Sequence, residues 1–156
     1  MSRAEIVCLH LANALVVVTG VIYTVMRYLL EPADEWAVVN HPWQPDVQHL
    51  HVLMAPLLVF AVGMIWSTHV MSKLRNVREG RLTGISLLSC FVPMALSGYA
   101  IQVVVDEGWR TAWMVVHLLA SAAWIVAFII HLLRTLIARR RERAEASEPL
   151  GIDLAA

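Results

Sequence analysis

Charge is scarce in this chain. Only 15% of its 156 residues are Asp, Glu, Lys or Arg, whereas 59% are hydrophobic. An average soluble domain has about 25% charged residues, so this composition excludes an ordinary soluble globule. We therefore expect lipid to be the solvent for most of the chain.

Cysteine is scarce as well. The two cysteines, Cys8 and Cys90, fall in different apolar stretches, and neither belongs to a C-x-x-C-H sequence. Because c-type haem is attached through that motif, a covalently bound haem is excluded. We interpret both thiols as small apolar groups packed within helices.

Acidic groups are missing from the apolar stretches. Between the charges that flank these stretches there is no Asp, Glu or Lys. A di-iron centre built from inward-facing Glu and Glu-x-x-His is therefore excluded. A carboxylate proton relay or a sodium site is disfavoured for the same reason.

The apolar stretches themselves predict four transmembrane helices, at about 6–28, 47–72, 82–105 and 109–137. Each holds the roughly 20 residues that cross about 30 Å of hydrocarbon. The first stretch exceeds the roughly 7–15 residues of a signal-peptide core, so we expect it to be retained. The sequence thus predicts an all-α membrane protein, with a four-transmembrane-helix up-down bundle over residues 1–138 and a cytoplasmic tail over residues 139–156.

Positive charge predicts the orientation, because loops rich in Lys and Arg stay in the cytoplasm. Two arginines, Arg27 and Arg110, lie on the face opposite to the termini. The other ten positive residues share the face of the termini: Arg3, Lys73, Arg75, Arg78, Arg81, Arg134, Arg139, Arg140, Arg141 and Arg143. We therefore expect both termini in the cytoplasm.

Histidine is the polar residue that the predicted helices do contain. Five of the seven histidines fall within them: His10, His51, His69, His117 and His131. Imidazole is costly in hydrocarbon unless a partner satisfies it, so such residues are functional candidates. We expect His49, at the outer edge of the second helix, to make an interfacial hydrogen bond instead.

The last predicted helix carries the strongest pattern. The interval from His117 to His131 is almost four helical turns, or about 21 Å along one helix face. Two haems stacked across a membrane need ligands at such a separation. The alternative interpretation is a pair of unrelated interhelical hydrogen bonds.

The other histidines match these two levels if successive helices alternate in direction. His51 lies at the outer level of His117, and both His10 and His69 lie at the cytoplasmic level of His131. A bis-histidine site can therefore be drawn at each level. The interval from His51 to His69 is five whole turns, so the two share a helix face and His69 competes with His10 as the inner ligand.

The stretch His10-Leu-Ala-Asn-Ala-Leu-Val-Val-Val-Thr-Gly20 resembles the first helix of the di-haem cytochrome b subunits of formate dehydrogenases and nickel–iron hydrogenases, and of bacterial cytochrome b561. In that family a His opens the first helix and a Thr-Gly or Ser-Gly pair follows some three turns later. The fourth helix of the family carries two His at the spacing of His117 and His131. The resemblance extends over residues 6–137, and a departure is Leu11, where the family usually has Trp.

The resemblance implies two b-type haems, the inner one bound by His10 and His131 and the outer one by His51 and His117. It further implies electron transfer between the quinone pool and a redox partner protein, as one subunit of an oxidoreductase complex in a bacterial inner membrane. The chain would not be a stand-alone enzyme, and no nucleic-acid partner is expected.

Further site residues are expected around the haems. Arg134 is a candidate for a haem propionate, and His69, Asn13 and Gln102 are candidates for hydrogen bonds to a quinone, although each also suits ordinary packing. Small residues are expected to let helices approach or to make room for a flat macrocycle: Gly20, Gly63, Gly98, Ala120, Ser121 and Ala122.

Two functions of other classes compete with a cytochrome. One is a membrane protein that handles a transition metal through its histidines, although a transport site would gather its ligands at one depth. The other is a haem-free membrane anchor that recruits a partner through its basic tail. A reduced-minus-oxidised visible spectrum separates all three, since only a cytochrome gives a b-type signal.

Overall fold

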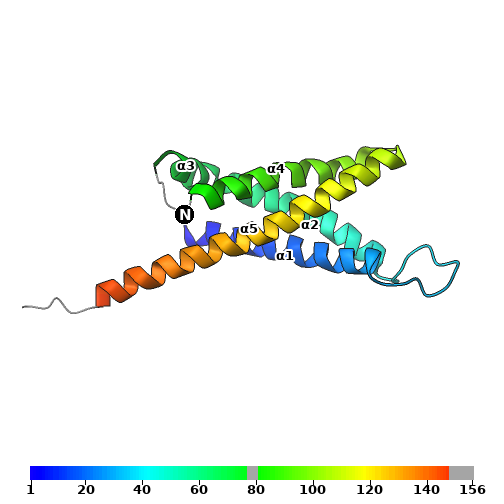
Figure 1. Ribbon diagram of the computed structural model, residues 1–156, viewed down its shortest axis with the longest axis horizontal. Helices are drawn as coiled ribbons and strands as arrows, with labels where there is room; N and C mark the ends of the chain where they lie inside the picture. The colour runs from blue at the N-terminus through cyan, green and yellow to red at the C-terminus, as the bar shows by residue number, and fades with distance from the viewer. Residues whose placement is uncertain (77–80, 148–156) are drawn as a thin grey trace, which may run out of the picture. The chain divides into compact units, whose positions relative to one another are not determined.

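The computed structural model describes residues 1–76 and 81–147, and over those ranges its regular elements are all helices (Figure 1). In chain order they are α1 (Arg3–Tyr28), α2 (Gln44–Met64), the π-helix η1 (Trp66–Met71), α3 (Ser72–Asn76), α4 (Arg81–Val103) and α5 (Glu107–Ser147). Arg78 and residues 148–156 of the predicted tail lie outside the described residues.

Four of these helices are long and apolar enough to cross a membrane: Arg3–Tyr28, Gln44–Met64, Leu82–Val103 and Glu107–Ala146. Many of their exposed side chains are large and apolar, as with Phe60 at 64% exposure and Leu119 at 68%. Lipid would cover such side chains at no cost. Over the described residues, the predictions of an all-helical fold and of four helices long and apolar enough to span a membrane are confirmed. Such helices indicate a multi-pass membrane protein.

The chain forms two compact units, Met1–Asn76 and Val77–Ala156. In the first unit α1 packs against α2, and in the second α4 packs against α5. The second pair encloses a small aromatic core, in which Trp124 of α5 lies 5.5 Å from Phe91 of α4 and 6.4 Å from Phe128, measured between ring centroids. Each unit is therefore a helical hairpin with its own side-chain contacts.

Local hydrogen bonds define both ends of α1. At its start the Ser2 hydroxyl accepts from the backbone N–H of Glu5 at 3.2 Å, and the Glu5 carboxylate accepts from that of Ser2 at 2.7 Å. This capping box satisfies two amide groups that a helix start leaves open. At its end the Asn40 side chain donates to the carbonyls of Arg27 and Leu30, at 3.0 and 2.8 Å, which ties the following loop to the helix.

The second predicted helix is divided in the structure. Instead of one α-helix over 47–72, α2 is followed by the π-turn η1 and the short α3. The N–H groups of His69 and Val70 both donate to the carbonyl of Ile65, at 2.9 and 3.2 Å, which widens the turn. Such π-turns are rare and often lie at functional sites, and His69 lies within this one.

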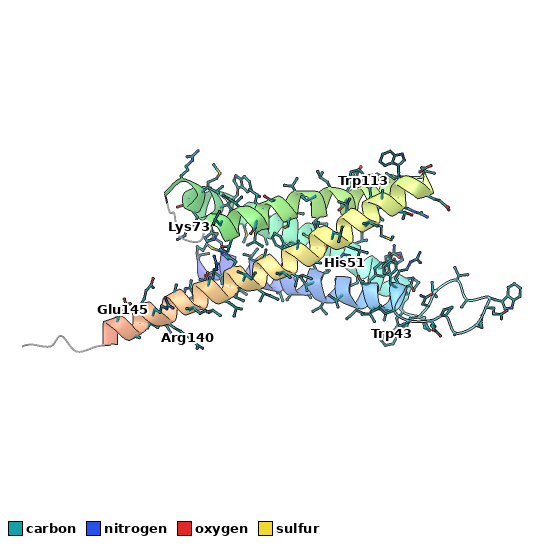
Figure 2. All side chains as sticks on the ribbon, viewed as in Figure 1. Trp43, His51, Lys73, Trp113, Arg140 and Glu145 are labelled. Atoms are coloured by element: carbon teal, nitrogen blue, oxygen red, sulfur yellow. The ribbon has the colours of Figure 1, made fainter. Side chains whose placement is uncertain are left out.

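The last helix continues past its predicted end near residue 137. α5 has 41 residues, which gives a length of about 60 Å, roughly twice the hydrocarbon thickness. Arg140 and Glu145 lie on this extension (Figure 2). Residues 139–147 of the predicted tail are therefore a direct continuation of the spanning helix.

Candidate functional site: histidines held between paired helices

In the first unit, the imidazole of His51 on α2 lies against the Thr19-Gly20 pair of α1. The Thr19 hydroxyl oxygen is 3.1 Å from His51 Nδ1. A Cβ added to Gly20 would lie 2.8 Å from His51 Cε1, closer than carbon atoms can approach. Glycine is therefore required at position 20 for the ring to lie in this position. His51 is labelled in Figure 2.

The hydrogen bonds of Thr19 assign the protonation of the His51 ring. The Thr19 hydroxyl donates to the carbonyl of Leu15 at 2.7 Å, and a hydroxyl has one proton to donate. Towards His51 it therefore acts as an acceptor, and the proton of the neutral ring is on Nδ1. The lone pair of this tautomer is on Nε2, which is the nitrogen that would coordinate a metal.

The second unit repeats this arrangement at His117 of α5, against the Ser97-Gly98 pair of α4. The Ser97 hydroxyl oxygen is 3.2 Å from His117 Nδ1, and a Cβ added to Gly98 would lie 3.1 Å from His117 Cε1. The carbonyl oxygen of Met94 is 2.9 Å from the same Nδ1. Because a carbonyl only accepts, the proton again lies on Nδ1 and the lone pair on Nε2.

A third contact of this kind joins α4 to α5 at His131, the other predicted ligand on α5. The Thr83 hydroxyl oxygen is 3.0 Å from Nδ1 of His131. The interval from Thr83 to Ser97 along α4 equals that from His117 to His131 along α5, so the two antiparallel helices carry matching pairs in one register. This site is less tight, because a Cβ added to Gly84 would meet no described atom within 4 Å.

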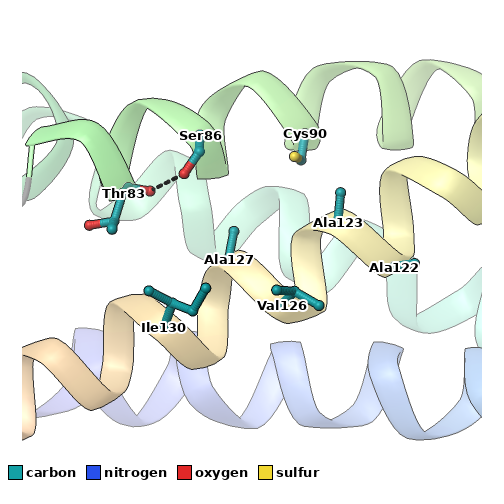
Figure 3. A pocket seen from close by; sticks show the side chains of 8 residues that line it. All are labelled: Thr83, Ser86, Cys90, Ala122, Ala123, Val126, Ala127 and Ile130. Carbon is teal, nitrogen blue, oxygen red and sulfur yellow. Dashed lines mark hydrogen bonds between the residues drawn. The ribbon is translucent and has the colours of Figure 1, made fainter.

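A groove of about 470 Å³ opens between α4 and α5 beside Thr83 (Figure 3). Its wall consists mostly of small side chains: Thr83, Ser86, Cys90, Ala122, Ala123, Val126, Ala127 and Ile130. Along α5 the groove lies between the levels of His117 and His131. Ala122, one of the small residues expected to make room between helices, is part of this wall.

The two candidates for the inner ligand in the first unit differ in setting. His10 lies on an exposed part of α1, whereas His69 is half-buried in η1. At α-helical rise, His10 precedes Thr19 by about 13.5 Å and His69 follows His51 by about 27 Å. These values bracket the axial separation of the two histidines in the second unit, so spacing does not choose between His10 and His69.

The remaining predicted site residues lie at scattered positions. Asn13 is buried about one turn after His10. Gln102 is exposed and donates to the carbonyl of Gly98 at 3.1 Å, a bond within its own helix. Arg134 is exposed and lies one turn after His131 on α5, and His49 is exposed near the start of α2.

Sequence reasoning missed the hydroxyls of Ser97 and Thr83 and the carbonyl of Met94. A signal for the two hydroxyls was present, because Gly20, Gly84 and Gly98 each follow a Ser or Thr. Each of those three hydroxyls contacts a histidine Nδ1. By contrast, the predicted small residue Gly63 follows a valine, and an added Cβ there would meet none of the described atoms within 4 Å.

Within residues 1–76 and 81–147, no three His, Cys, Asp or Glu side chains gather as a metal-binding group. A haem iron needs only two axial protein ligands, so the histidines described here fit that donor set. No protein-family model, no curated protein and no solved structure matches the chain.

Proposed function

We propose that this chain is a di-haem b-type cytochrome subunit that carries electrons across a membrane. One observation carries the proposal: His51 and His117, the two residues that the family resemblance pairs on one haem, are held in the same way. Each has a Ser-Gly or Thr-Gly pair against its ring, a proton on Nδ1 and a lone pair on Nε2.

These features are those that an axial ligand requires. A metal-binding imidazole must be neutral and is usually oriented by a hydrogen bond from its other ring nitrogen. An ordinary interhelical hydrogen bond would need the hydroxyl alone. It would give no reason for a glycine at the point of contact in two different helix pairs, with hypothetical Cβ distances of 2.8 and 3.1 Å.

The proposed ligand sets follow from these residues. His51 and His117 would bind the outer haem, and His131 would bind the inner haem with His10, or alternatively with His69. Bound haem would supply reversible one-electron redox chemistry. With two histidines for each haem, the protein would transfer electrons and would not bind oxygen or a substrate at the metal.

The wider assignment rests on the charge pattern and the resemblance. The proposed topology is an up-down bundle with both termini in the cytoplasm of a bacterium. Within a larger complex, the chain would exchange electrons with a redox protein subunit and with membrane quinone. Asn13, His69 and Gln102 remain the proposed quinone contacts, and Arg134 the proposed propionate contact.

The direct test is a reduced-minus-oxidised spectrum of the purified chain, combined with haem extraction. We expect a low-spin b-type spectrum and about two haems per chain, all released by acidic acetone because no thioether bond forms. A chain without haem would favour a metal-handling protein or an anchor subunit instead. A single haem per chain would contradict the two-level assignment.

A further inference from the structure

We propose that Thr19 and Ser97 are positioning residues that lower the reduction potential of the outer haem. This inference rests on the proposed function, since it concerns the two ligands of that haem. It adds two residues outside the ligand set.

Both hydroxyls accept a hydrogen bond from the imidazole that they contact. The proton of the Thr19 hydroxyl is used on the carbonyl of Leu15 at 2.7 Å, so its oxygen accepts from His51 Nδ1 at 3.1 Å. The Ser97 hydroxyl donates to the carbonyl of Pro93 at 2.5 Å, so its oxygen likewise accepts from His117 Nδ1 at 3.2 Å. Each hydroxyl is thus fixed as an acceptor by its own helix.

A hydrogen-bond acceptor at Nδ1 would change the reduction potential of a haem iron bound through Nε2. An acceptor at Nδ1–H raises the basicity of the imidazole and its electron donation through Nε2. Stronger donation stabilises the oxidised iron more than the reduced iron, so it lowers the reduction potential. Removal of an acceptor should therefore raise the potential of the outer haem.

The Nδ1 atom of His117 has a backbone contact in addition to the hydroxyl. His117 Nδ1 also lies 2.9 Å from the carbonyl of Met94, which is nearer than the Ser97 oxygen. A Ser97→Ala variant keeps this backbone acceptor, whereas Thr19→Val removes a side-chain acceptor at 3.1 Å. We therefore expect only a small shift from Ser97→Ala, because the Met94 carbonyl still accepts from His117 Nδ1.

Thr24 provides a matched control on the same helix. Its hydroxyl donates to the carbonyl of Gly20 at 2.8 Å, the same bond to the preceding turn that Thr19 makes. The described bonds of this hydroxyl include no histidine nitrogen. Thr24→Val thus removes an equivalent hydroxyl from α1 and leaves the acceptor of His51 in place.

The experiment is a potentiometric titration of the haem-loaded full chain, followed in the visible spectrum. We expect the outer-haem potential to rise in Thr19→Val, to rise slightly in Ser97→Ala, where the Met94 carbonyl remains as an acceptor, to return to the wild-type value in Thr19→Ser and to stay unchanged in Thr24→Val. An unchanged potential in Thr19→Val with both haems bound would overturn the proposal, as would an equal shift in Thr24→Val.

Two further readouts keep the proposal testable. If Thr19→Val does not retain the outer haem, Ser97→Ala decides, and an unchanged potential there overturns the proposal. In the haem-free chain, ¹⁵N spectra of labelled histidine should report a proton on Nδ1 of His51 and His117. A proton on Nε2 would refute this inference alone, whereas failure to bind haem would refute the proposed function.

Discussion

Two of the histidine sites are tight, and a third is open. At His51 and His117 the opposing helix approaches so closely that a Cβ on its glycine would lie 2.8 or 3.1 Å from the ring. At His131 the Thr83 hydroxyl makes a similar contact at 3.0 Å, but a Cβ on the neighbouring Gly84 would meet no described atom within 4 Å. A hydroxyl contact is therefore common to all three rings, whereas close helix approach distinguishes the two proposed ligands of the outer haem.

The largest effect is expected from a substitution at a tight site. Replacement of His117 by Ala should remove the outer haem completely and leave the inner haem, because the inner level uses His131 on the same helix. The measurement is haem content per chain, which should fall from about two to about one. His131→Ala is the matched variant and should remove the inner haem instead. Retention of both haems in His117→Ala would contradict the proposal that α5 supplies a ligand to each haem.

The second prediction concerns the inner level, to which the open site belongs. If the first-helix resemblance holds, His10→Ala should abolish the low-spin spectrum of the inner haem, because His131 alone leaves one axial position open. His69→Ala should leave that spectrum intact and at most alter the reaction with quinone. Visible and electron paramagnetic resonance spectra of both variants provide the measurement. The reverse result would transfer the inner ligand to the π-turn η1.

The spanning helices could be predicted because hydrocarbon imposes a length and a composition that are visible in the sequence. The extension of α5 was less visible, since a run of charge is typical of a tail. The segment around Arg140 is nevertheless rich in Arg, Glu and Ala, which favour helix, and continuing a helix needs no new nucleation. The π-turn at His69 depends on which carbonyl accepts the hydrogen bond of a backbone N–H group. No residue pattern specifies that acceptor.

For the candidate site, the histidine spacing was enough to propose the ligands. It did not identify the residues that hydrogen-bond to them. The contact of Ser97 with His117 depends on the register between α4 and α5. That register could have been inferred from the equal spacing of Thr83 and Ser97 on one helix and of His117 and His131 on the other. The contact between the Met94 carbonyl and His117 could not have been inferred from the sequence. Every residue has a carbonyl, and only the packing of the two helices determines which one lies near the ring.

Substitution of the glycines that face the imidazoles is expected to have a smaller effect than loss of a histidine. Gly20→Ala would place a Cβ 2.8 Å from His51 Cε1, so the ring must shift; Gly98→Ala would place one 3.1 Å from His117 Cε1 and should cost less. Overpacking of this kind typically costs about 1–3 kcal/mol, which corresponds to an affinity for the outer haem weaker by about 5- to 150-fold. Gly84→Ala is the matched control on α4: it also follows a hydroxyl residue, but its added Cβ would meet none of the described atoms within 4 Å. Haem titration of the three variants should therefore rank Gly20→Ala as weakest, then Gly98→Ala, with Gly84→Ala close to wild type. Equal affinities in all three would mean that the close approach of helix and imidazole plays no part in holding the haem.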